Sequence, residues 1–128
     1  MIQTIPEDQW SEVCAGFASR HRGWLARVMM VSDTDAATEE QELAVDVPLR
    51  AILVEGQGAD ARIRILAGEV DDPVAYPVPH PRVLMLEHRP DGSEAGLRID
   101  DAEGARTLVR FRVIADPETL DGLAPAEL

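Results

Sequence analysis

The spacing of apolar residues predicts one amphipathic helix near the start of the chain. Apolar side chains recur at the i, i+3, i+4, i+7 spacing of a single helical face, at Trp10, Val13, Cys14 and Phe17. Thr4 and Glu7 fit a capping box at the helix start, and His21 falls in the last turn before Gly23, where a helix commonly ends. We expect the apolar stripe to be buried, with His21 as a packed or capping side chain.

The rest of the chain is patterned as strands. Apolar and β-branched runs occur at 24–31, 49–55, 61–68, 83–88, 96–100 and 106–113, and residues 71–82 are a proline-punctuated edge or loop. Residues 32–42 are acidic and polar, which predicts a mobile loop. The pattern predicts an α+β domain, with the N-terminal helix packed on an antiparallel, hairpin-connected meander sheet of about six strands. The pattern does not decide whether that sheet closes into a barrel.

Two further features outline the domain. The globular part is expected to span residues 1–114, and the acidic stretch 115–128 to be a loosely docked or disordered tail. Ile5-Pro6, Trp10, Phe17, the run His21-Arg22-Gly23-Trp24-Leu25 and the late "TLVRFR" resemble a bacterial family of small uncharacterised proteins, a domain of unknown function. The resemblance implies a compact single domain and no particular activity.

The charge balance restricts the possible partners. The chain carries 24 acidic and 12 basic residues for a net charge of −12, and every basic residue is an arginine. Such a chain repels phosphate backbones and anionic lipid surfaces, so neither nucleic acid nor a membrane is expected as a partner. Without lysine, neither a Schiff base nor a P-loop can form. The lone Cys14 and the lack of a signal-like start favour a cytoplasmic protein.

No catalytic or metal-binding constellation stands out. Three histidines and one cysteine show none of the usual ligand spacings, so no metal and no cofactor is expected. A calcium loop beginning at Asp33 fails, because Thr38 and Ala44 stand where glycine and glutamate are needed. Cys14 and His21 would lie about 10 Å apart along one helix, too far for a thiolate–imidazole pair. The sequence leaves enzymatic activity open but leans against it.

Two turns predict the register of the last three strands. "RPDGS" and "DAEGA" fit three-residue hairpin loops, which would place His88 opposite Glu94 and Asp100 opposite Arg106. One face would then form a core, with Val83, Met85, Leu97, Ile99, Val109, Phe111 and Val113. The other would combine apolar and basic side chains: Leu84, Leu86, His88, Arg98, Leu108, Arg110 and Arg112.

This second face is the candidate binding site. Its plainer interpretation is leucines covered by the helix, with arginines paired to carboxylates. Its functional interpretation is a site for an anionic or amphipathic ligand or an acidic partner segment, with Arg98 and Arg110 as forks and Arg112, His88, Leu84 and Leu86 around them. The function expected first is a non-catalytic interaction or accessory protein with an unknown protein partner, a homodimer being possible. A ligand binder is the alternative, and an enzyme of unknown class the third.

Overall fold

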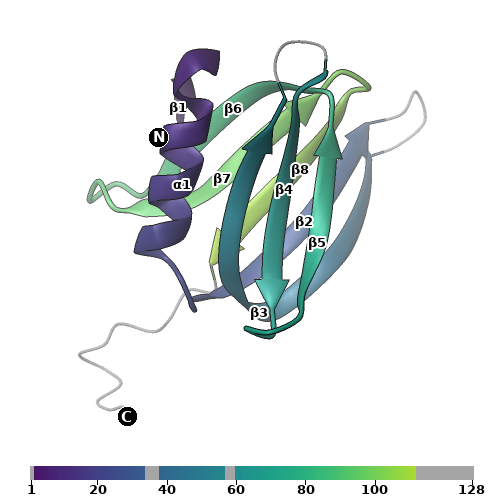
Figure 1. The fold of residues 1–128 in the computed structure, drawn as a ribbon. Helices are drawn as coiled ribbons and strands as arrows, with labels where there is room; N and C mark the ends of the chain where they lie inside the picture. Colours follow the sequence, from purple (N-terminus) through teal and green to yellow (C-terminus); the bar gives the residue numbers. More distant parts are fainter. Residues whose placement is uncertain (1, 34–37, 57–59, 112–128) are drawn as a thin grey trace.

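In a computed structural model, residues 2–33, 38–56 and 60–111 are described (Figure 1). The elements, in chain order, are β1 (Ile2–Ile5), the 3-10 turn η1 (Glu7–Gln9), α1 (Trp10–Arg20), β2 (Leu25–Asp33), β3 (Thr38–Glu55), β4 (Arg62–Gly68), β5 (Pro73–Pro79), β6 (Pro81–His88), β7 (Glu94–Asp101) and β8 (Ala105–Phe111). The fold is therefore α+β and mostly sheet, as predicted.

Eight antiparallel strands form one open sheet. Their order is β1-β6-β7-β8-β2-β3-β4-β5, so the sheet does not close into a barrel and has two strands more than the sequence suggested. The first part of β3 pairs with β2 and the second part with β4. Two register shifts around Val28 and a left-handed Asp46 (φ 54°) accompany this bend.

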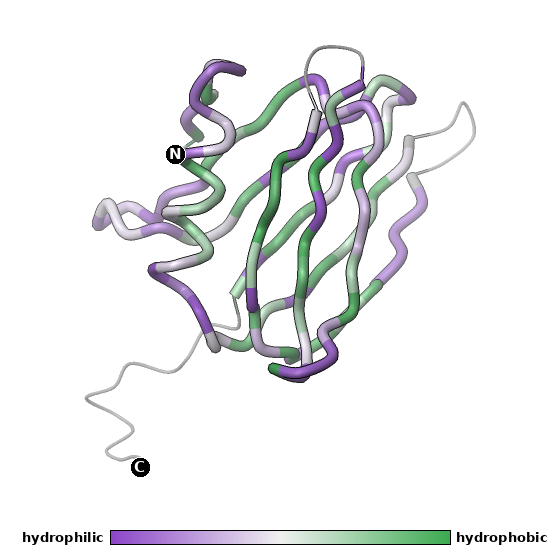
Figure 2. The backbone as a smooth tube through the Cα atoms, in the orientation of Figure 1, coloured by the Kyte–Doolittle hydropathy of each residue, from purple (hydrophilic) through white to green (hydrophobic). Residues whose placement is uncertain are grey.

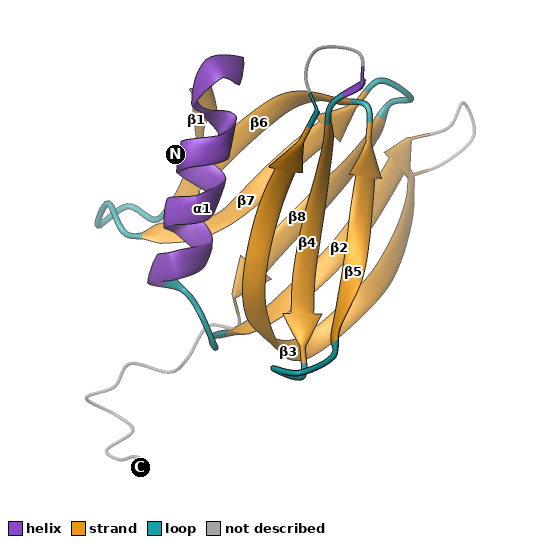
Figure 3. Cartoon of the chain, in the orientation of Figure 1, coloured by secondary structure: helices purple, strands orange, loops and turns teal. Residues whose placement is uncertain are grey.

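The bend divides the sheet into two layers. The front layer is the second part of β3 with β4 and β5, which face the viewer in Figure 1; the rear layer is β1, β6, β7, β8, β2 and the first part of β3. The helix lies along the open side between the layers (Figure 3). One core fills the space enclosed by all three, and it includes Phe17, Ile65 and Leu97, each fully buried.

The predicted helix is confirmed, but its predicted start is wrong. Trp10, Cys14 and Phe17 are buried and Val13 packs against the same core. Thr4 caps nothing, because it lies in β1 opposite Met85 and the helix has no side-chain cap. Pairing with β6 gives residues 2–5 more backbone hydrogen bonds than a cap would. At the other end, Gly23 takes the predicted left-handed conformation (φ 86°).

The acidic loop predicted at 32–42 is largely a hairpin arm instead. β2 continues to Asp33, and residues 38–42 pair with it, for example Glu40 with Val31 and Glu42 with Met29. The acidic side chains occupy the exposed edge of this arm, where charge is well tolerated. Their polarity therefore did not indicate a loop. The proline-punctuated segment is the edge strand β5. The predicted tail 115–128 lies outside the described residues.

Candidate functional site

The predicted arginine–leucine face does not exist as a single surface. Both predicted turns are correct for the residue pairs next to the loops, since His88 pairs with Glu94 and Asp100 pairs with Arg106. A bulge then slips β6 by one residue, so that Leu86 pairs with Leu97 and Leu84 with Ile99. Such a slip turns every side chain of a strand over. Leu84 and Leu86 therefore lie in the core, on the side opposite Arg98.

The two arginines predicted as forks, Arg98 and Arg110, are already paired with carboxylates of the same chain. The Nε and Nη2 atoms of Arg98 donate to Asp100 at 2.9 and 3.2 Å, and this hydrogen bonding raises the pKa of Arg98. Arg110 donates in the same way to Glu87, at 3.2 and 3.3 Å. Neither guanidinium presents an unoccupied fork, so this face lacks the feature that motivated the anion-binding hypothesis.

The other members of the predicted site do not rebuild it. The His88 Nδ1 atom lies 3.2 Å from the Gly92 carbonyl oxygen, and its Nε2 atom lies 3.3 Å from the side-chain oxygen of Gln3. Arg112 lies outside the described residues. The binding role assigned to this group of residues remains a prediction, without the apolar surface it required.

His21 has the packing role predicted for it. Its Nδ1–H donates to the Phe17 carbonyl oxygen at 2.7 Å, because a carbonyl can only accept. Its ring stacks on Phe111 at 4.5 Å between centroids and meets Trp24 edge-on at 4.7 Å. The Nε2 atom lies 3.7 Å from Glu94, which also receives a bidentate pair from Arg20. These contacts fasten the end of the helix to the β6–β7 hairpin.

Cys14 is a core thiol. It is fully buried, and burial raises its pKa from 9.0 to about 12. Because the thiolate is the reactive species, this cysteine is inert near neutral pH.

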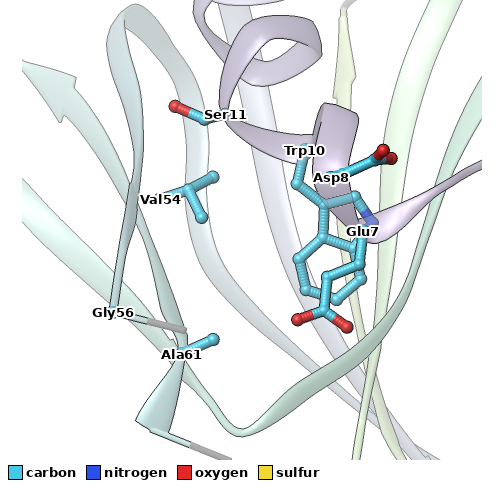
Figure 4. A pocket seen from close by; sticks show the side chains of 7 residues that line it. All are labelled: Glu7, Asp8, Trp10, Ser11, Val54, Gly56 and Ala61. Carbon is cyan, nitrogen blue, oxygen red and sulfur yellow. The ribbon is translucent and has the colours of Figure 1, made fainter. Parts of the chain in front are cut away.

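A hollow of about 610 Å³ lies between the helix start and the end of β3. It is lined by Trp10, Val54, Ala61, Gly56, Ser11, Glu7 and Asp8 (Figure 4). Its two carboxylates point in different directions in Figure 4 and are both exposed. As side chains of the first helical turns, they sit at the positive end of the helix dipole. The stabilisation they give the helix accounts for their position.

The outward side of the front layer is the more informative surface. Nine positions on three paired strands form it, and we call it the front face: Ala51, Leu53 and Glu55 on β3; Arg62, Arg64 and Leu66 on β4; Ala75, Pro77 and Pro79 on β5. Leu53, Arg64 and Pro77 form its central row. The alternate residues, such as Ile63 and Ile65, are buried in the core, and Figure 2 shows hydrophilic and hydrophobic residues alternating in the first part of β4.

The front face is apolar apart from two arginines and one glutamate. Leu53 is 38% exposed, which is high for a leucine in a paired strand, and Ala75, Pro77 and Pro79 are exposed as well. Arg64 is held loosely, since its Nη1 atom lies 3.8 Å from Glu55. The Nε atom of Arg64 is a covered donor for which the described residues provide no acceptor. A covered donor without a partner is uncommon in native proteins and calls for an explanation.

The sequence predicted strands at 49–55 and 61–68, but it did not predict that they pair to form this face. Ile63 and Ile65 alternate with Arg62 and Arg64 in the sequence, which is the pattern of a strand with one apolar and one basic side. The neighbours of these arginines are set by the pairing of β4 with β3 and β5, which the alternation does not reveal. The prolines at 73, 77 and 79 were the available signal, because they mark β5 as an edge strand.

The described ranges hold no group of three or more His, Cys, Asp or Glu side chains placed to bind a metal ion. No helix within them is long and apolar enough to cross a membrane.

Comparisons with known proteins give one distant similarity in fold. No family model matches the sequence, and no curated protein matches it either. The crystal structure of the Bacillus subtilis YojF protein aligns with a TM-score of 0.48 and 14% sequence identity. The alignment covers 90% of this chain and 98% of that one. The family resemblance noted in the sequence therefore stays a prediction.

Proposed function

We propose that the chain is a non-catalytic interaction module that binds a partner protein through the front face. The observation that carries the proposal is a cluster of apolar side chains around two arginines, in which Leu53 on β3 and Ala75, Pro77 and Pro79 on β5 are exposed. Contiguous exposed apolar surface on a soluble protein commonly marks an interaction site. We place the protein in the cytoplasm, and its net charge of −12 disfavours nucleic acid as the partner.

The contrast between the two layers supports this choice of surface. On the outer side of the rear layer, Met29, Val31 and Leu108 form a second apolar cluster, but each is at most 8% exposed. Arginine–carboxylate pairs surround that cluster. This cluster is thus covered, whereas the front face leaves Leu53 and the β5 prolines open to solvent; the exposed large apolar side chains of the rear layer, Ile2, Leu25 and Val45, lie on three different strands.

The test is affinity purification from the native cell with two matched variants. Leu53→Asp places a charge in the central row of the front face. Val45→Asp places the same charge on the same strand, at a 52% exposed position that lines a groove of the rear layer. We expect one partner protein to co-purify equally with wild type and with Val45→Asp. The same protein should not co-purify with Leu53→Asp. Circular dichroism and thermal unfolding show whether both variants are folded.

The proposal fails if no protein is retained specifically. It also fails if the retained protein is lost with Val45→Asp and kept by folded Leu53→Asp, because the contact would then lie on the rear layer.

A further inference from the structure

We infer that the front face binds an acidic segment of its partner, one that carries apolar side chains between its carboxylates. The inference rests on the proposed function and specifies the chemistry of the partner. It follows from three properties of the face: its charge, the state of its arginines and its size.

The charge of the front face is opposite to that of the chain. Arg62 and Arg64 against Glu55 give the face a net charge of +1, while the chain as a whole carries −12. An acidic segment would be repelled by most of this surface and attracted here, which favours one docking position. A basic segment would be drawn to the acidic remainder of the surface instead.

The arginines of the front face have fewer side-chain partners than Arg98 and Arg110 of the rear layer. Arg98 and Arg110 each donate two hydrogen bonds to one carboxylate. Arg64 has a 3.8 Å ion contact and an unpartnered Nε atom, and Arg62 is exposed beside it on the same side of β4. A guanidinium with unused donors is suited to a bidentate bond with an incoming carboxylate. Rotation of the Arg64 side chain toward the partner would also give its Nε atom an acceptor.

The size of the face suits a segment and not a globular partner. Three strands about 4.8 Å apart, with three outward positions each, cover an area of roughly 300 Å². A stable interface between two globular proteins buries about 800 Å² on each side. A short segment that lies across the strands matches the smaller area, as its leucine-sized side chains would pack beside Leu53, Leu66 and Pro77.

The free edge of the front layer, strand β5, cannot bind a peptide as an additional β-strand. Proline has no N–H, so Pro73, Pro77 and Pro79 fit only where the backbone N–H would point away from β4. Among the alternate positions 73, 75, 77 and 79 that face the free edge of β5, only Ala75 keeps a donor. A peptide therefore cannot add to β5 as another strand and must use the face.

The test is selection of a random peptide library displayed on phage against the whole folded chain. Enriched peptides are then synthesised and their affinities measured for wild type, Arg62→Glu, Leu53→Asp and Arg82→Glu. Arg82 is an exposed arginine on β6 and serves as the matched control for the charge change. We expect peptides rich in Asp, Glu and apolar residues. Arg62→Glu and Leu53→Asp should weaken their binding about tenfold or more, while Arg82→Glu should change it by less than about twofold.

Three outcomes would overturn the inference. The first is that no peptide is enriched, and the second is that the enriched peptides show no excess of acidic residues. The third is binding that is as strong with folded Arg62→Glu as with wild type. If purification from cells still yields a partner that depends on Leu53, the proposed function stands and only the acidic chemistry is wrong.

Discussion

Gly96 lies where the Arg110–Glu87 ion pair crosses β7. It pairs with Arg110 on one side and Glu87 on the other, so the two side chains meet over a residue that has none. A methyl group added there would clash with the Val109 carbonyl oxygen and lie 3.1 Å from the Arg110 Cγ atom and 3.2 Å from a Glu87 carboxylate oxygen. The backbone and the ion pair together explain the glycine.

We predict that Gly96→Ala lowers the free energy of unfolding by about 1–3 kcal/mol, because a strand backbone cannot move aside as a side chain can. Urea denaturation measures this. The control is Gly16→Ala in the helix, where the added methyl would meet only the flexible end of Arg20, at 2.9 Å. That variant should be as stable as wild type or gain up to about 1 kcal/mol. Equal losses in the two variants would contradict the explanation.

Cys14 provides a pH-dependent prediction. Burial raises its pKa from 9.0 to about 12 in the folded state, so the folded thiol stays protonated where the unfolded thiol ionises. Its contribution is fully present below pH 9 and is lost as pH rises from 9 toward 12, at about 1.4 kcal/mol per pH unit. Denaturation curves over this alkaline range should therefore show a steeper loss of stability in wild type than in Cys14→Ala. Parallel pH profiles would show that the thiol ionises equally in both states.

At the scale of elements, the helix depends on its first buried residue. Trp10 is 4% exposed, and its indole N–H donates to the Ile5 carbonyl oxygen at 2.9 Å, which ties α1 to β1. We predict that Trp10→Ala lowers the free energy of unfolding by about 3–5 kcal/mol in chemical denaturation. Trp24→Ala should cost less than half as much, since Trp24 is 43% exposed. A loss within about 1 kcal/mol for Trp10→Ala would contradict the assignment of that face.

Features that depend on one element could be predicted from the sequence, whereas features that depend on the pairing of two elements could not. Periodicity located the apolar stripe of the helix, because the stripe depends on one element alone. The faces of β6 were predicted the wrong way round, because the bulge between Glu87 and His88 leaves Ala95 of β7 without a partner in the register, and neither turn signal encodes that extra residue. The second half of the acidic loop was missed for a related reason, since residues 38–42 become a strand only by pairing with β2.

For the whole molecule, the unpredicted features are those that need partners distant in the chain. The division into two layers depends on the bend of β3, and the front face depends on three strands meeting. The sequence predicted an arginine–leucine face for an anionic or amphipathic ligand or an acidic partner segment. It placed that face around Arg98 and Arg110 in the rear layer, whereas the face that we propose lies around Arg62 and Arg64 and depends on the pairing of β3, β4 and β5.

The most direct test of the front face is site-specific photocrosslinking in the cells that express the protein. A photoreactive amino acid at position 53 samples the front face, and the same residue at position 45 samples the rear layer from the same strand. The account predicts one discrete crosslinked product from position 53 that carries a second protein, much weaker when Arg62→Glu is added, and no such product from position 45. Crosslinks of equal yield and identity from both positions, or none from position 53, would contradict it.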